Sequence, residues 1–212
     1  MKDIAIFGVG GFGREVLTLI QDINRQEPIW NIIGFFDDGH PQGEVVNGYM
    51  TLGGMSVLNQ WPTQLDIVVA IGDPLTKKSI LGRICNPNIS YPSLIHPTVL
   101  IGDRNYVEIG QGCIICAENI ITTNVKIGDF VLFNLACTTG HDTAIQNFSS
   151  FMPSVNISGE VSVGEGVYMG TGVKIINQVS IGDYATIGAG AVVTKSLPGH
   201  CTAVGVPAKV IK

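Results

Sequence analysis

A histidine followed by an aspartate, His141-Asp142, is the pair in this sequence best suited to chemistry. A free imidazole titrates near neutral pH, and a neighbouring carboxylate can orient it or raise its basicity, so the pair can act as a general base. A solvated turn histidine without a catalytic role is the simpler alternative. The residues around the pair must therefore decide between the two interpretations.

A second candidate site lies near the N-terminus, where glycines follow a short apolar stretch. Residues 4–7 are predicted to form a strand, Gly8–Gly13 has the spacing G-x-G-x-x-G, and a helix is predicted from about Arg14 to Asn24. Glycine backbones at such a turn can approach a phosphate, and the helix N-terminus offers free N–H groups. Asp37 and Asp38 follow the next apolar strand, where dinucleotide-binding folds place the acid that binds a ribose hydroxyl.

These motifs predict a small α/β domain over residues 1–92 with a parallel, Rossmann-like sheet. A third buried strand over 67–71 ends at Gly72, and a helix is predicted from Leu75 to Cys85. The stretch from Glu44 to Trp61 is predicted to be a loop that leads into a short helix. Such a sheet is about half of a full dinucleotide-binding domain, which suits a mononucleotide better than NAD. An NAD-dependent oxidoreductase is therefore disfavoured.

A six-residue repeat dominates the rest of the chain, residues 93–212. From Ile109 to Val193 a large apolar residue returns at every sixth position except Thr139, and mostly small or β-branched residues follow four places later. Two inward residues in six suit short strands wound around a narrow core, whereas a helix would need a 3.6-residue period. A slower period of eighteen indicates three hexads per coil, with residues eighteen apart stacked at about 4.8 Å.

The eighteen-residue grid places further residues beside the histidine. Gly159 lies one coil beyond His141, so we expect the imidazole to face outward next to a backbone that has no side chain. The Gly159 amide is a candidate donor to the oxyanion that forms when a thioester is attacked. Small outward residues at Pro153, Thr171 and Ala189 predict a shallow groove for a pantetheine arm, with ordinary turn composition as the alternative.

Composition narrows the classes of partner. A net charge of −5 without a basic run argues against nucleic acid and anionic membranes. No segment reads as a membrane span or a secretory signal, so we expect a cytoplasmic protein. Five cysteines, three of them within the repeat, argue against a disulfide framework. Cys113 and Cys116 have metal-ligand spacing but no partner pair, so we expect core packing rather than zinc.

Together these features resemble the bacterial nucleotide-sugar acetyltransferases with hexapeptide repeats. The resemblance covers nearly the whole chain and rests on the glycine loop with Asp37-Asp38, the Ser93–Pro97 entry, Gly140-His-Asp142 and the ending at 204–209. It implies a left-handed parallel β-helix after the α/β domain; the left hand comes from the resemblance alone. The family includes UDP-4-amino-sugar and GDP-perosamine N-acetyltransferases and sialic-acid O-acetyltransferases.

The resemblance also implies roles for individual residues. His141 would remove a proton from a sugar amine, supported by Asp142. Acetyl-CoA, the co-substrate, would be contacted at Ser150, Gly159, Thr171 and Ala189. The nucleotide sugar would be bound at Gly10, Gly11, Phe12, Asp37, Asp38 and Gly72. Two positions depart from the family's pattern, because Ser150 stands where a second histidine is common and Phe12 where the glycine loop often carries histidine.

We therefore expect transfer of an acetyl group to the C4 amine of a nucleotide-linked amino-deoxysugar for surface glycan synthesis, by direct attack and without a metal. The family further implies a homotrimer, with active sites between neighbouring coils. An O-acetyltransferase acting on a sugar hydroxyl, and a nucleotide-sugar-binding protein without turnover, are the alternatives. The residues do not fix the nucleotide (UDP, GDP or dTDP), the sugar or the acyl-chain length.

Overall fold

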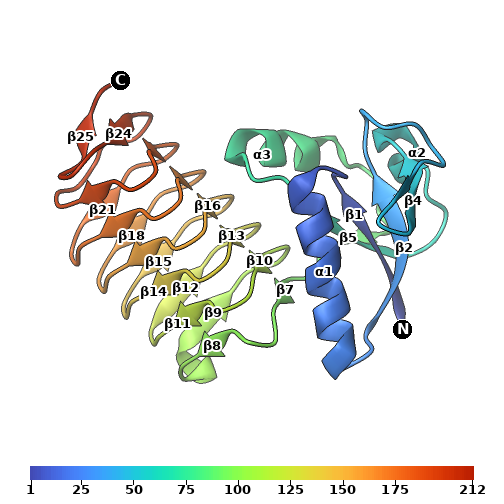
Figure 1. The fold of residues 1–212 in the computed structure, drawn as a ribbon, viewed down its shortest axis with the longest axis horizontal. Helices are drawn as coiled ribbons and strands as arrows, with labels where there is room; N and C mark the ends of the chain where they lie inside the picture. The colour runs from blue at the N-terminus through green and yellow to red at the C-terminus, as the bar shows by residue number, and fades with distance from the viewer. The chain divides into compact units, whose positions relative to one another are not determined.

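The computed structural model describes residues 1–212 and divides them into two compact units, Met1–Pro92 and Ser93–Lys212 (Figure 1). Each unit encloses its own cluster of buried apolar side chains. None of the helices combines the length and the apolar composition that crossing a membrane would require.

The N-terminal unit is built on one largely parallel sheet with the strand order β3-β4-β2-β1-β5-β6. Its strands are β1 (Lys2–Phe7), β2 (Trp30–Phe36), β3 (Val45–Val46), β4 (Tyr49–Gly53), β5 (Leu65–Val69) and β6 (Ile89–Ser90). Its helices are α1 (Gly11–Gln26), α2 (Met55–Asn59) and α3 (Pro74–Arg83). The predicted alternation of strands and helices is confirmed, although α1 begins three residues before Arg14, within the glycine motif itself.

The stretch from Glu44 to Trp61 was predicted as a loop and a short helix, and the prediction missed a hairpin. Strands β3 and β4 pair antiparallel around Asn47 and Gly48, which both adopt positive φ angles, 49° and 85°. Asn-Gly is the preferred dipeptide for such a two-residue turn. β4 then continues the sheet by pairing in parallel with β2.

The C-terminal unit is a left-handed parallel β-helix whose short strands form three sheets (Figure 1). The first sheet contains β7 (Leu94–Ile95), β10 (Ile114–Ile115), β13 (Leu132–Phe133), β16 (Ser150–Phe151), β19 (Tyr168–Met169), β22 (Thr186–Ile187), β24 (Thr202–Val204) and β25 (Lys209–Val210). The second contains β8 (Leu100–Ile101), β11 (Ile120–Ile121), β14 (Thr138–Thr139), β17 (Asn156–Ile157), β20 (Lys174–Ile175) and β23 (Val192–Val193). The third contains β9 (Val107–Ile109), β12 (Val125–Ile127), β15 (Ala144–Ile145), β18 (Ser162–Val163) and β21 (Ser180–Ile181).

Strand pairing confirms the eighteen-residue coil. Thr139 pairs with Ile157, and Phe133 pairs with Phe151, each partner lying one coil further on. The first coil departs from this register, because Leu100 pairs with Ile120, and the extra residues form the 3-10 turn η1 (Arg104–Tyr106) between β8 and β9. Both inward series of the hexads are buried from Cys113 to Val193, and Ile109 at the start is partly buried, so the sequence pattern identified the core correctly.

The turns between strands stack into ridges along the β-helix. The His141 ridge, as we name it, consists of Thr123-Asn124, His141-Asp142, Gly159-Glu160 and Asn177-Gln178. The Thr171 ridge consists of Ala117-Glu118, Leu135-Ala136, Pro153-Ser154, Thr171-Gly172 and Ala189-Gly190. The second residue of nearly every turn adopts a positive φ, for example 56° at Asp142 and 59° at Glu160. This left-handed conformation turns the chain sharply into the next strand.

Candidate active site

His141 and Asp142 form a hydrogen-bonded pair on the outside of the coil, as predicted. Nδ1 of His141 lies 2.7 Å from Oδ2 of Asp142, and the two side chains are 57% and 50% exposed. Asn124, one coil earlier, donates from Nδ2 to the other carboxylate oxygen at 3.0 Å. The hydrogen bonds from His141 and then Asn124 hold the pKa of Asp142 below its usual value. Asp142 is therefore an ionised acceptor at neutral pH.

This arrangement assigns the two nitrogens of the imidazole. An ionised carboxylate only accepts hydrogen bonds, so Nδ1 of His141 carries the proton that it donates to Asp142. The other nitrogen, Nε2, then holds a lone pair and has no partner within the chain. A neutral imidazole oriented in this way is ready to accept a proton from a ligand.

Glycine at position 159 makes room for the imidazole. A β-carbon on Gly159 would lie 2.6 Å from Nε2 and 2.7 Å from Cε1 of His141. Gly140 is needed for a related reason, because a β-carbon there would lie 2.5 Å from the Gly159 nitrogen. Nε2 therefore faces the coil of Gly159, as the eighteen-residue grid predicted.

The amide of Gly159 is a free donor beside the imidazole. Gly159 is buried, its carbonyl accepts from Gln178, and its own N–H has no acceptor within the chain. At the equivalent position of another ridge, the Glu165 amide donates at 2.8 Å to the Asp183 carboxylate one coil further on. The Gly159 N–H is therefore available to an acceptor on a ligand. What distinguishes it from other unpaired turn amides, such as those of Thr171 and Ala189, is its position beside Nε2 of His141.

The coil beneath the histidine contains inward hydroxyl groups. Thr143 donates to the Ser158 carbonyl at 3.2 Å, and Ser149 donates to the Gly164 carbonyl at 2.9 Å. Thr139, which precedes Gly140 and replaces a large apolar residue, is 1% exposed, and its hydroxyl has no partner. The break in the hexad pattern at Thr139 therefore leaves a buried hydroxyl without a hydrogen bond, which lowers the stability of the core at this position.

The predicted groove residues Thr171 and Ala189 are exposed neighbours on the Thr171 ridge. The Gly190 amide donates to the Thr171 carbonyl at 2.8 Å, and the Gly172 amide donates to the Pro153 carbonyl at 2.9 Å, so the turns stack in register. β-carbons added at Gly172 and Gly190 would meet no atom within 4 Å. The ridge is therefore open and lined with small residues.

Ser150 does not fit the expectation of a contact with acetyl-CoA. Its residue is fully buried in the structure, at 0% exposure, and its amide donates to the Val167 carbonyl in the ladder between β16 and β19. A ligand contact needs an accessible hydroxyl, so we do not assign Ser150 to the site. The family pattern placed it there by position alone, and burial was not visible in the hexad spacing.

Asp37 and Asp38 lie at the carboxyl edge of the N-terminal sheet, as predicted. Asp37 accepts from the amides of Val9, at 2.9 Å, and Gly39, at 2.7 Å. Burial raises the pKa of Asp37, but these two amides and His40 outweigh that effect and leave the pKa below its usual value. Asp37 therefore fastens the glycine loop to the end of β2.

Asp38 is held by two other partners. It accepts from the Met55 amide at 2.7 Å and from the Arg83 guanidinium at 2.9 Å. The Met55 hydrogen bond is the main reason why the pKa of Asp38 is low, with Arg83 adding to it against the effect of burial. The carboxylate thereby joins the start of α2 to the end of α3.

A pocket of about 490 Å³ opens beside these carboxylates. Its polar lining comes from Asp37, Asp38, Thr76, Ser79 and Arg83. The other predicted positions, Gly10, Gly11, Phe12 and Gly72, lie in the loops and the start of α1 that follow β1 and β5, and they do not line this pocket. Thr76, Ser79 and Arg83 were not among the predicted site residues, although their spacing puts them on one face of the predicted helix.

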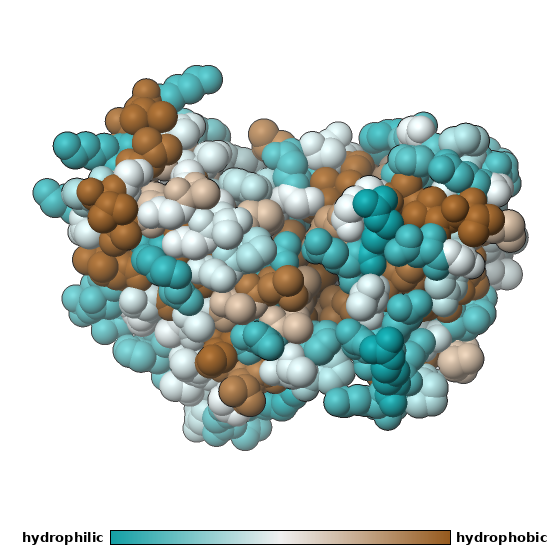
Figure 2. Space-filling model, in the orientation of Figure 1, coloured by the Kyte–Doolittle hydropathy of each residue, from teal (hydrophilic) through white to brown (hydrophobic).

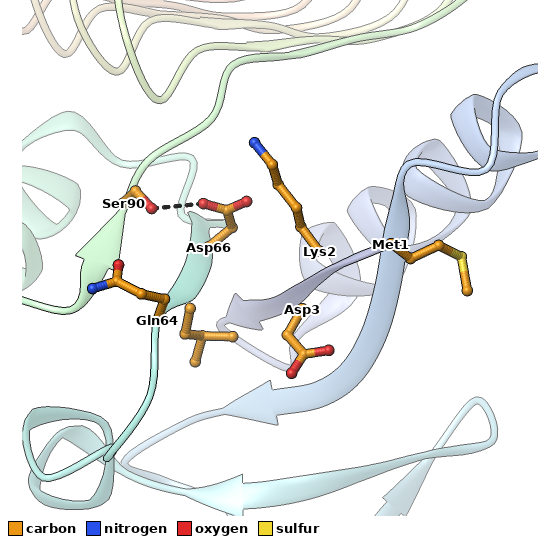
Figure 3. Close-up of a pocket in the computed structure, with 7 residues that line it drawn as sticks. Met1, Lys2, Asp3, Gln64, Asp66 and Ser90 are labelled. Atoms are coloured by element: carbon orange, nitrogen blue, oxygen red, sulfur yellow. Dashed lines mark hydrogen bonds between the residues drawn. The ribbon is translucent and has the colours of Figure 1, made fainter.

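The opposite edge of the same sheet has a separate hollow (Figure 3). It lies at the amino ends of β1 and β5 and is lined by Lys2, Asp3, Asp66 and Ser90, with Ser90 donating to Asp66 at 2.7 Å. Ligands of parallel α/β sheets bind at the carboxyl ends of the strands, so the pocket beside Asp37 is the better candidate.

The side chains of the chain do not form a metal-binding cluster. No group of three or more His, Cys, Asp and Glu side chains is placed to hold an ion. Cys113 and Cys116, which have metal-ligand spacing, are 0% and 7% exposed, and the Cys113 thiol lies 3.1 Å from the Gly128 carbonyl. Burial raises the pKa of the Cys137 thiol to about 11, so this residue is a poor nucleophile.

Comparison with known proteins defines the class. Residues 3–84 match the PglD N-terminal domain, and residues 160–195 match the bacterial transferase hexapeptide family (six repeats). The GDP-perosamine N-acetyltransferase of Escherichia coli O157:H7 is 31% identical over 175 residues, which cover 82% of this chain and 78% of that protein. The fold and the two matches define a hexapeptide-repeat acyltransferase with an N-terminal domain of the PglD type.

Two solved structures are similar over the full length. A histidine-to-asparagine mutant of perosamine N-acetyltransferase from Caulobacter crescentus, in complex with CoA and GDP-perosamine, is 26% identical with a TM-score of 0.90 and covers 100% of this chain and 98% of its own. The acetyltransferase domain of PglB from Neisseria gonorrhoeae, in complex with acetyl coenzyme A, is 31% identical with a TM-score of 0.89, covering 99% of each chain. The chain belongs to the family of nucleotide-sugar acetyltransferases that includes GDP-perosamine N-acetyltransferase.

Proposed function

We propose that this protein transfers the acetyl group of acetyl-CoA to the amino group of a nucleotide-linked amino-deoxysugar, at C4, for glycan synthesis. The observation that carries the proposal is the orientation of His141, with Nδ1 held by Asp142 and Nε2 free over Gly159. The relatives that bind CoA and GDP-perosamine support the classes of co-substrate and acceptor.

His141 is the general base in this proposal. As the amine nitrogen attacks the thioester carbon, one N–H proton passes to Nε2 of His141, and Asp142 stabilises the imidazolium that forms. The tetrahedral intermediate then collapses: the amide is complete, the C–S bond breaks, and the proton passes to the CoA sulfur, which leaves as a thiol. No residue of the enzyme becomes acylated.

The Gly159 amide is the proposed donor to the oxyanion of the tetrahedral intermediate. It is an N–H without a partner within the chain, and it lies in the turn that Nε2 faces. A preorganised donor of this kind typically contributes about 10²- to 10³-fold to the rate. The base and the donor then act on the same thioester.

Acetyl-CoA is proposed to lie along the Thr171 ridge. Thr171 and Ala189 are exposed, and the glycines that follow them leave space for an extended chain. The nucleotide is proposed to occupy the pocket beside Asp37 and Asp38, with the glycine loop and the N-terminus of α1 close to the phosphates.

We also propose that the protein works in the cytoplasm as a homotrimer. Leu100 and Ile120 are 64% and 41% exposed, and they line an apolar hollow that also reaches Thr122 and Thr123, the second of which belongs to the His141 ridge. Exposed apolar surface beside a site is typical of an interface. Figure 2 shows a second apolar area at the C-terminal end of the β-helix, where Val206 and Ile211 are exposed. Light scattering after gel filtration tests the trimer, and a monomeric mass contradicts it.

The reaction itself is tested by product analysis. The enzyme is incubated with acetyl-CoA and UDP-, GDP- or dTDP-linked 4-amino-4,6-dideoxysugars, and the products are identified by mass spectrometry and NMR. An acetamido group at C4 of one of these sugars is the expected product. Acetylation of a hydroxyl instead, or no turnover while acetyl-CoA still binds, contradicts the proposal.

A further inference from the structure

We infer that Glu160 is a second contact for the acceptor's amino group and binds it as an ammonium ion. This inference rests on the proposed function and deepens it, because it specifies a cationic acceptor and gives a reason for preferring an amine to a hydroxyl. Nothing in the hexapeptide pattern requires an acid at this position, which is a turn residue of the coil.

The position of Glu160 relative to the base carries the inference. The Glu160 amide donates to the His141 carbonyl at 2.8 Å, which fixes the two turns against each other. Nε2 of His141 faces Gly159, the residue immediately before Glu160. A ligand nitrogen that gives its proton to Nε2 is therefore next to the turn that carries the Glu160 carboxylate.

The carboxylate of Glu160 has unused hydrogen-bonding capacity. Gln178, one coil further on, donates from Nε2 to Oε2 of Glu160 at 3.0 Å, and Oε1 has no partner within the chain. By contrast, both oxygens of Asp142 are occupied, by His141 and Asn124. Glu160 is thus the carboxylate on the His141 ridge with an oxygen available to a ligand.

The charge of the ridge points to a cation. Asp142 and Glu160 stand one coil apart, and their flanking side chains along the ridge are the neutral amides of Asn124 and Gln178. No lysine or arginine forms an ion pair with either carboxylate. The ridge therefore carries two carboxylates without an ion-paired Lys or Arg, and a ligand cation beside Oε1 of Glu160 is attracted to this negative charge.

An ammonium ion fits this environment and the reaction. The acceptor binds as R–NH₃⁺ with hydrogen bonds to Oε1 of Glu160, and it releases one proton to solvent before attack. The neutral amine then gives its second proton to Nε2 of His141 as the N–C bond forms. A sugar hydroxyl has no positive charge, so it gains no such attraction from Glu160.

The test compares Glu160→Gln with the wild type on an active amino sugar. Glutamine has the same shape and can still accept from Gln178, so folding should be preserved, and thermal unfolding checks this. We expect KM for the amino sugar to rise about 10- to 100-fold below the pKa of the free acceptor amine, because a hydrogen bond between two charged groups is lost. The rise should shrink well above that pKa, and KM for acetyl-CoA should not change.

Two controls make the result specific. Glu108→Gln changes an exposed acid on β9, outside both the His141 ridge and the Thr171 ridge, and it should leave all parameters unchanged. The 4-hydroxy analogue of the sugar should inhibit wild type and Glu160→Gln equally. An unchanged KM for the amine, or an equal loss of affinity for amine and hydroxyl ligands, overturns the inference while wild-type turnover keeps the proposed function intact. A wild type that acetylates only hydroxyl acceptors overturns both.

Discussion

The imidazole of His141 lies so close to the α-carbon of Gly159 that a β-carbon there would come within 2.6 Å of Nε2. The backbone of Gly159 is not in the left-handed region, and the three nearest atoms to that β-carbon all belong to the imidazole. Alanine at this position is therefore compatible with the coil and incompatible with the orientation of the base.

Gly159→Ala should accordingly reduce kcat/KM about 100-fold or more, because the imidazole must move away from its productive position. The melting temperature should change little. Gly82→Ala is the matched control: its β-carbon meets no atom within 4 Å, and Gly82 lies near the end of α3. Full activity in Gly159→Ala would show that the observed orientation of His141 is not the one used for catalysis.

The groove on the Thr171 ridge is tested with Ala189→Glu. The substitution places a negative charge on an exposed turn where the phosphates or pantetheine of CoA are proposed to lie, so KM for acetyl-CoA should rise about tenfold or more by repulsion. KM for the acceptor should stay constant. Ser162→Glu, at an exposed position on β18 outside both ridges, serves as the control, and equal effects of the two variants would argue against a defined groove.

Because of Asp37, the stability of the N-terminal unit should fall as the pH becomes acidic. Its pKa is lowered in the folded state, so its contribution to stability is complete above the unfolded-state pKa and is lost as pH falls through the folded-state pKa. Asp37→Asn should lower the free energy of unfolding by about 1–3 kcal/mol at neutral pH, and the difference from wild type should diminish below about pH 4.

Tryptophan fluorescence is the appropriate measurement for that comparison. The chain's two tryptophans, Trp30 and Trp61, both lie in the N-terminal unit, so their emission follows its unfolding without a signal from the β-helix. A difference between Asp37→Asn and wild type that stays constant down to about pH 3 would mean that the carboxylate charge does not hold the glycine loop.

Replacing Thr139 or Thr143 by valine should change the stability of the β-helix in opposite directions, because only the Thr143 hydroxyl has a hydrogen-bond partner. Thr139→Val removes a hydroxyl that has no hydrogen-bond partner and should stabilise the β-helix by about 1 kcal/mol. Thr143→Val removes a hydroxyl that donates to the Ser158 carbonyl and should destabilise it by a similar amount. Thermal unfolding followed by circular dichroism distinguishes the two, and destabilisation by both variants would indicate that Thr139 has a partner in solution.

The hexad period predicted much of the site because a β-helix is nearly one-dimensional. Once residues eighteen apart are known to stack, the proximity of His141 and Gly159 follows from counting, and the structure shows it. The same counting puts Thr171 beside Ala189. In the N-terminal unit, by contrast, the Asn47-Gly48 hairpin was overlooked because its first strand has only two residues.

The hexad pattern could not predict which side chains are buried or which hydrogen-bond partners they have. The resemblance to the family placed Ser150 at the acetyl-CoA site, whereas the structure buries it completely. The pairing of Asp38 with Arg83 joins residues 45 positions apart in different elements, so no local signal marks it. Gln178 donates to only one carboxylate oxygen of Glu160 and leaves the other free, and this contact is visible only once the stacked turns are known.

The most direct test of the account is thiol release from acetyl-CoA in the presence of the preferred nucleotide-linked 4-amino sugar, measured for wild type and His141→Ala side by side. The proposed base predicts a loss of about 10²- to 10⁴-fold in kcat for the variant, with its fold and its binding of acetyl-CoA preserved. A variant that releases thiol as fast as the wild type would contradict the assignment of His141 as the residue that accepts the amine's proton.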